Sequence, residues 1–128
     1  VQRLQLEMDS LVGLDQMLLA FPKVKKSIMI DLDREKLFLG CQMKWTDAKP
    51  DIDLTRFDAA DNGVSRQHML LSRTRTGLTV TDLGSLNGTH VDRKRIDPYK
   101  PILLKNRSVI HIGQLAAQVF YRLSGGSH

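Results

Sequence analysis

Short apolar runs with a period of two, separated by polar turns, fill the chain from about residue 17 onward. Residues 27–32 are apolar at 28, 30 and 32, and residues 77–83 place Leu78 and Val80 on one face. Successive side chains of a β-strand point to opposite faces, so this alternation predicts half-buried strands. Many short strands without a long helical pattern between them favour an all-β antiparallel sandwich or barrel.

The first 15 residues follow a different period. Val1, Leu4, Met8 and Leu11 recur at spacings of three and four, which is typical of a helix. We therefore assign residues 1–15 to a short helix or a linker from upstream, 16–123 to one β-sandwich domain, and 124–128 to a disordered tail or an expression remnant. The same apolar stripe could also pair with a second copy, which leaves a homodimer open.

Composition narrows the class of protein. The 128 residues suit a single domain, and the apolar runs are too short to span a bilayer. A single cysteine, Cys41, excludes an intramolecular disulfide, so a cytoplasmic location is the default. The four histidines show no zinc-ligand spacing, and we expect no metal and no cofactor.

The charged residues are unevenly distributed along the chain. Residues 64–128 hold ten Lys/Arg against three Asp/Glu, whereas residues 1–63 hold nine Lys/Arg against eleven Asp/Glu. This basic half can attract acidic or phosphorylated partners.

Two neighbouring segments carry the most specific signal. Residues 64–68 read Val-Ser-Arg-Gln-His, and residues 82–89 read Asp-Leu-Gly-Ser-Leu-Asn-Gly-Thr. In order and spacing they resemble the S-R-x-H and N-G-T loops of forkhead-associated (FHA) domains, of bacterial type. The upstream pair 39–40, Leu-Gly, and the downstream residues 110–113, Ile-His-Ile-Gly, are similar to the same family. The resemblance covers about residues 17–123.

The resemblance implies an FHA-like (SMAD/FHA-type) antiparallel β-sandwich of about eleven strands in two sheets. It implies a phosphothreonine-recognition module that mediates protein–protein interaction in kinase signalling. Phosphothreonine carries about −1.5 to −2 charge and three acceptor oxygens, which hydroxyl and guanidinium donors suit. By the family pattern, Ser65, Arg66, Leu86 and Asn87 would contact the phosphopeptide, and Gly40, His68, Gly88 and Thr89 would structure the loops.

The chain departs from the family at Gly40-Cys41, where Gly-Arg is usual and the arginine contacts the phosphate. A hydrogen bond to a charged group contributes about 1.5–3 kcal/mol, so its loss weakens binding roughly tenfold to a hundredfold. Two readings stay open. In one, Lys44, Arg66 or Arg95 supplies the missing cation. In the other, the domain is degenerate and binds unphosphorylated protein or itself.

Two turns also depart from the pattern. Arginine stands where the family often has a turn glycine, in Asp92-Arg93 and in Asn106-Arg107. Glycine adopts positive φ angles freely and other residues do not, so these positions predict strained turns.

Catalysis and nucleic-acid binding are the rival functions. Ser65 and His68, with Asp82 as a third member, suggest a hydrolase triad, but a strand-borne Ser-x-x-His points its side chains to opposite faces. We expect no enzyme activity. A basic strip that includes residues 93–95, Arg-Lys-Arg, could attract nucleic acid, but aromatic residues are only 5% of the chain and offer few stacking platforms. We therefore favour a phosphothreonine-containing protein or peptide as the partner.

Overall fold

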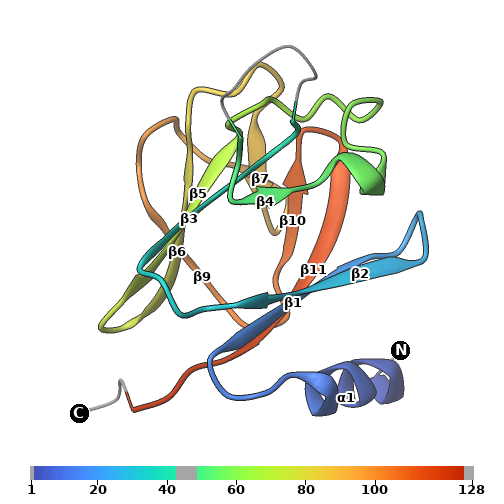
Figure 1. Cartoon of the computed structure of the whole chain (residues 1–128), viewed down its shortest axis with the longest axis vertical. Helices are drawn as coiled ribbons and strands as arrows, with labels where there is room; N and C mark the ends of the chain where they lie inside the picture. Colours follow the sequence, from blue (N-terminus) through green and yellow to red (C-terminus); the bar gives the residue numbers. More distant parts are fainter. Residues whose placement is uncertain (1, 43–48, 126–128) are drawn as a thin grey trace.

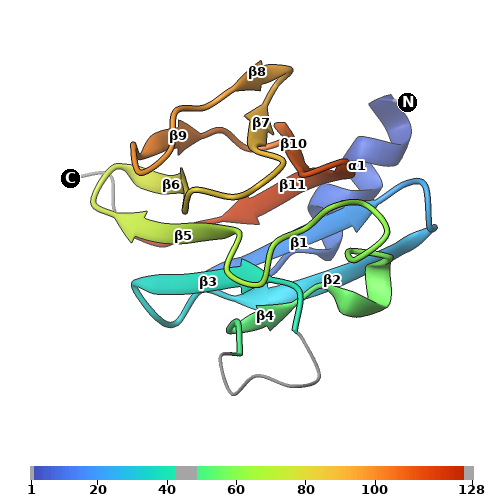
Figure 2. The same ribbon diagram turned by 90° about the horizontal axis from the view of Figure 1, so that it is seen from above.

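The fold is a sandwich of two β-sheets (Figures 1 and 2). The computed structural model describes residues 2–42 and 49–125, with side chains from residue 7 onward. One sheet has six strands in the order β2-β1-β11-β10-β7-β8, and the other has five in the order β4-β3-β5-β6-β9. Neighbouring strands are antiparallel except β3 and β4, which are parallel. The predicted eleven-stranded all-β sandwich is thus confirmed.

The strands are short, as the turn spacing of the sequence predicts. They are β1 (Gln16–Phe21), β2 (Lys26–Asp31), β3 (Lys36–Gly40), β4 (Ile52–Asp53), β5 (Met69–Thr74), β6 (Gly77–Asp82), β7 (Thr89–Val91), β8 (Lys94–Arg95), β9 (Ile102–Leu104), β10 (Val109–Ile112) and β11 (Leu115–Arg122).

The core lies between the two sheets, where alternate residues of each strand meet. Phe21 of β1 stacks on Phe57, with ring centroids 4.4 Å apart, and so anchors the 3₁₀ turn Thr55–Phe57 to the sandwich. Each fully buried side chain of this kind contributes about 1.5–3 kcal/mol. The largest buried members are Phe21, Phe57, Met17, Leu19, Ile30, Leu39, Leu54, Met69, Leu71, Leu78 and Leu104.

Helix α1 (Gln2–Leu11) packs on the outer face of the six-stranded sheet. A second apolar cluster forms there from Val12, Leu18 and Phe120, with Met8 of the helix packed against it. In Figure 1 the helix (blue) lies at the lower end of the molecule, away from the green connection that follows β4. No helix in the described part of the chain is long and apolar enough to cross a membrane.

The turns with arginine in place of glycine have the backbone that the sequence predicts. Asp92 and Arg93 join β7 to β8 with φ angles of 49° and 73°, and Arg107 has φ 73°. Two central residues with positive φ define a type I′ turn, which favours Asn-Gly. The guanidinium of Arg107 pairs with Asp9 of α1, so this arginine also ties the helix to the sheet.

Replacing Arg93 by glycine should relieve one strained position. We expect Arg93→Gly to raise the free energy of unfolding by about 0.5–1 kcal/mol in urea denaturation. A non-glycine residue with a positive φ costs about 1–2 kcal/mol, which the glycine removes. Part of this gain is offset because glycine gives the unfolded chain more conformational entropy. Lys94→Gly is the control, since Lys94 lies in β8 and should lose stability instead. A loss of stability in Arg93→Gly would contradict the strain.

Candidate functional site

A buried histidine joins the two motif loops. His68 is fully buried, its Nδ1 accepts the backbone N–H of Ser65 at 3.0 Å, and its Nε2 lies 2.9 Å from the carbonyl oxygen of Gly88. Because Nδ1 accepts a hydrogen bond, the proton of the neutral ring is on Nε2, which donates to Gly88. Burial lowers the pKa of His68 below its ordinary value, and it outweighs the opposing effects of the Gly88 hydrogen bond and of Asp82. The neutral ring therefore clamps the 63–68 connection to the β6–β7 loop.

Asp82 fixes the second loop from inside. It ends β6 and is 2% exposed, and its carboxylate accepts the hydroxyls of Ser85 at 2.5 Å and Thr89 at 2.7 Å. The backbone N–H groups of Gly84 and Ser85 donate to its other oxygen. Burial acts to raise the pKa of Asp82, but these hydrogen bonds outweigh it and hold the pKa below its usual value. The β6–β7 loop is thus held by four hydrogen bonds to one ionised carboxylate.

The two predicted ligand residues Ser65 and Asn87 also cross-link the loops. The backbone N–H of Leu86 donates to Ser65 Oγ at 3.2 Å, and Asn87 Nδ2 donates to the carbonyl of Gly63 at 2.9 Å. Each side chain keeps unused capacity: the Ser65 hydroxyl proton can still donate, and the Asn87 amide oxygen can still accept. Both are therefore preorganised with free groups for a ligand.

Gly40 leaves space for this arrangement. A Cβ at that position would lie 1.8 Å from the carbonyl oxygen of Arg66, so only glycine lets β3 approach the Ser65-Arg66 backbone. The next residue adds a hydrogen bond to this contact, since the Cys41 N–H donates to the Ser65 carbonyl at 3.0 Å. Gly40 is thus a packing requirement of the site.

Cys41 faces the core. It is 3% exposed, and its Sγ lies 3.5 Å from Thr55 Oγ1. Leu39, two residues earlier in β3, is also fully buried. From the sequence alone, we expect Cys41→Arg to tighten phosphopeptide binding by about a decade or more. Because position 41 is buried, an arginine there has to turn its side chain out of the core before it reaches a ligand, and this costs free energy.

Two arginines provide exposed positive charge at these loops. Arg66 lies between Ser65 and His68 and is exposed. Arg95 of β8 lies across Gly88, since a Cβ on that glycine would be 2.9 Å from Arg95 Nε. Within residues 2–42 and 49–125 the ion pairs involve other residues, so both guanidinium groups remain free for a ligand. Lys44, the third predicted cation, lies outside the described residues.

Sequence reasoning missed three contributors. Gly63 has a φ of 71°, and a Cβ there would lie 2.5 Å from Asn87 Nδ2, so the loops meet closely at this point. Tyr99 donates its hydroxyl to the Leu83 carbonyl at 3.2 Å and braces the β6–β7 loop from outside. Gly113 N–H donates to the Gly88 carbonyl at 3.0 Å, beside the His68 ring. The Asn-Gly dipeptide at 62–63 is a turn signal that could have indicated the first of these.

The same contacts argue against a hydrolase triad of Ser65, His68 and Asp82. His68 bonds the backbone of Ser65, while the Ser65 hydroxyl oxygen accepts from Leu86. This is a structural arrangement, without a hydrogen bond from nucleophile to base. The described residues also hold no group of three or more side chains suited to a metal ion.

The comparisons with known proteins agree with this geometry. A family model described as the FHA domain matches residues 39–113, more than half of the chain. The chain belongs to the FHA family. No match was found among curated proteins.

Solved FHA domains share the fold. The solution structure of the FHA domain of an Arabidopsis thaliana hypothetical protein is 21% identical with a TM-score of 0.66, covering 91% of this chain and 93% of that one. A structure described as an analysis of phosphothreonine-dependent FHA domain interactions is 20% identical with a TM-score of 0.62, covering 84% and 96%. Mycobacterium tuberculosis EmbR in complex with a low-affinity phosphopeptide is 22% identical with a TM-score of 0.63, covering 86% of this chain and 25% of that one.

The clamp predicts a large loss of stability when His68 is removed. His68→Ala leaves the Ser65 N–H without its acceptor and the Gly88 carbonyl with only the Gly113 N–H as donor. An unsatisfied group costs about 1–3 kcal/mol, and the space left by the buried ring adds to the loss. We expect the free energy of unfolding to fall by about 2–4 kcal/mol in urea denaturation. His111→Ala is the control, because that half-exposed side chain has no hydrogen bond in the described structure and should cost less than about 1 kcal/mol. Equal losses in the two variants would contradict the clamp.

The lowered pKa of His68 predicts a pH dependence. The unfolded chain binds the proton first, near the ordinary value of 6.5, so stability is full above that pH and falls as pH drops toward the folded-state pKa. The slope reaches about 1.4 kcal/mol per pH unit for one proton. Asp82 acts in the same direction but only near its ordinary value of 3.8 and below. Unfolding in urea at pH 7.5, 6.5 and 5.5 should show the decline, and His68→Gln should remove most of it. An unchanged slope in that variant would assign the effect to other groups.

Proposed function

We propose that this FHA domain binds phosphothreonine-containing proteins and mediates protein–protein interaction in kinase signalling. The observation that supports this most directly is the pair of loops joined by His68, which carry Ser65 and Asn87. Arg66 follows Ser65 in the chain, and Arg95 lies across Gly88, the residue after Asn87. A fixed hydroxyl donor and guanidinium groups at the same loops suit the three oxygens of a phosphate.

Each side chain has a distinct role in this proposal. The Ser65 hydroxyl proton and the Arg66 guanidinium bind phosphate oxygens. Asn87 binds the peptide main chain through its free amide oxygen. Leu86 is 86% exposed at the tip of the β6–β7 loop and contacts an apolar side chain of the partner.

Arg95 replaces the arginine that the family usually has after Gly40. Its guanidinium crosses Gly88, next to Asn87, whereas Cys41 is turned into the core. The replacement comes from β8 of the six-stranded sheet instead of from the end of β3, so it reaches the loops from the other sheet. The phosphate would then be held by Arg66 from the loop before β5 and by Arg95 from β8. Because Cys41 is a free, buried thiol, we also propose a cytoplasmic location.

Titration calorimetry with a phosphothreonine peptide library and its unphosphorylated counterpart tests the proposal. We expect the phosphorylated peptides to bind at least about tenfold more tightly. Arg66→Ala and Arg95→Ala should each lose about tenfold to a hundredfold in affinity, because each removes a charged hydrogen bond. Arg75→Ala is the control for net charge, since Arg75 is an exposed residue in the turn between β5 and β6.

Equal affinity for both peptides would contradict phosphothreonine recognition. It would favour the alternative that the domain is degenerate and binds unphosphorylated protein or itself. A loss in Arg66→Ala without a loss in Arg95→Ala would keep phosphate binding but reject Arg95 as the substitute cation.

A further inference from the structure

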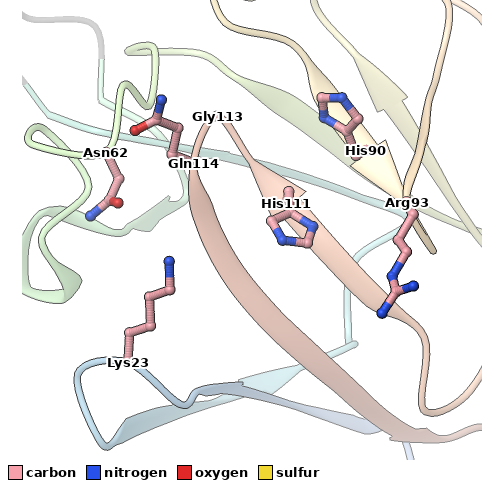
Figure 3. Close-up of a pocket in the computed structure, with 7 residues that line it drawn as sticks. All are labelled: Lys23, Asn62, His90, Arg93, His111, Gly113 and Gln114. Carbon is pink, nitrogen blue, oxygen red and sulfur yellow. The ribbon is translucent and has the colours of Figure 1, made fainter.

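A pocket of about 390 Å³ borders the loop contacts described above at Gly113, which lines it and donates its N–H to the Gly88 carbonyl. Four basic side chains line it: Lys23 from the β1–β2 turn, His90 of β7, Arg93 from the β7–β8 turn and His111 of β10 (Figure 3). His111 alternates along β10 with Ile110 and Ile112, which are buried in the core, so it points to the outer face of the six-stranded sheet. Basic groups from three separate parts of the chain therefore converge on one hollow.

The two histidines form the floor of this pocket. They are directly opposite each other in the β10–β7 ladder, and their rings meet edge to face with centroids 6.4 Å apart. His90 Nδ1 is buried and has no hydrogen-bond partner. A buried N–H without an acceptor is costly, so the neutral ring keeps its proton on Nε2, which becomes the donor for a ligand.

The charges that face the histidines are mostly positive. The acidic residue of the same turn, Asp92, already accepts hydrogen bonds from Ser108 Oγ at 3.0 Å and from the Val109 N–H at 2.9 Å. On β8, Arg95 pairs with His90 but lays its guanidinium over Gly88. On β11, the residue opposite His111 is the uncharged Ala116. No acidic side chain is among the described residues that line the pocket.

Two carboxamides complete the rim. Asn62 and Gln114 belong to different loops, which are joined by a hydrogen bond of 2.7 Å from the Gln114 N–H to the Asn62 carbonyl. The Asn62 Nδ2 already donates to the Asp58 carbonyl at 2.8 Å. The Gln114 carboxamide therefore adds the neutral donor to the cationic lining.

We propose that this pocket binds an oxyanion, the phosphate or carboxylate group of an acidic partner. Lys23 and Arg93 supply positive charge, and the two imidazoles supply ring N–H donors. The pocket shares no residue with the proposed phosphothreonine contacts Ser65, Arg66 and Asn87, so either proposal can fail alone.

NMR spectroscopy of the histidine ring signals tests the proposal. Inorganic pyrophosphate and a hexaglutamate peptide serve as separate probes, each titrated at pH 7 in low salt. We expect saturable shifts of His90 and His111 with at least one probe. Pyrophosphate alone would indicate a phosphate site, and hexaglutamate alone would indicate a site for acidic side chains.

Variants separate the pocket from general surface charge. Lys23→Ala and Arg93→Gly should each weaken binding by about fivefold or more, and Arg93→Gly should do so in a domain that is more stable than the parent. His90→Gln combined with His111→Gln should also weaken binding by about fivefold or more, read from backbone amide shifts. Lys105→Ala removes the same charge in the turn after β9 and should change nothing.

Ser65→Ala combined with Asn87→Ala should abolish phosphothreonine binding and leave pyrophosphate binding at the pocket intact. Shifts that grow linearly without saturation for both probes would overturn the proposal. So would an equal loss in Lys105→Ala and Lys23→Ala.

Discussion

The carbonyl oxygen of Gly88 is the point on which the ligand loops depend. It accepts hydrogen bonds from His68 Nε2 and from the Gly113 N–H, and so links the β6–β7 loop with the 63–68 connection and the β10–β11 turn. The His68 ring carries that link to Ser65 through its other nitrogen. His68, Gly88 and Gly113 are buried, where an unpaired partner would be costly. The loops are therefore fixed relative to one another before any ligand arrives.

This hydrogen-bond arrangement explains why the residues of the two motif loops have different roles. His68, Thr89 and Gly40 satisfy buried groups or leave room for backbone, and none of them keeps a free donor toward solvent. Ser65 is half-buried and Asn87 is exposed, and each keeps an unused hydrogen-bond donor or acceptor. A ligand then meets groups that need little reorganisation, which reduces the entropy lost on binding.

Much of this could be predicted from the sequence. Alternation indicated the strands, since the burial of Leu78 and Val80 follows the period of two, and the arginines at 93 and 107 correctly predicted turns with positive φ. Other features depend on contacts between distant residues. Cys41 lies just beyond β3 and is buried where its N–H donates to the Ser65 carbonyl, and the position of Arg95 over Gly88 follows from the pairing of β7 with β8. The contact between His90 and His111 could not be predicted for the same reason, because these residues become neighbours only through the pairing of β7 with β10.

The end of the sandwich that His68 clamps is the proposed phosphothreonine site. Backbone amide chemical-shift mapping with one phosphothreonine peptide and its unphosphorylated counterpart can locate the bound peptide. We expect the amides of Ser65, Arg66, Asn87 and Gly88 to shift with the phosphorylated peptide and to remain in place with the other. Equal shifts with both peptides, or shifts confined to a different face of the sandwich, would contradict it.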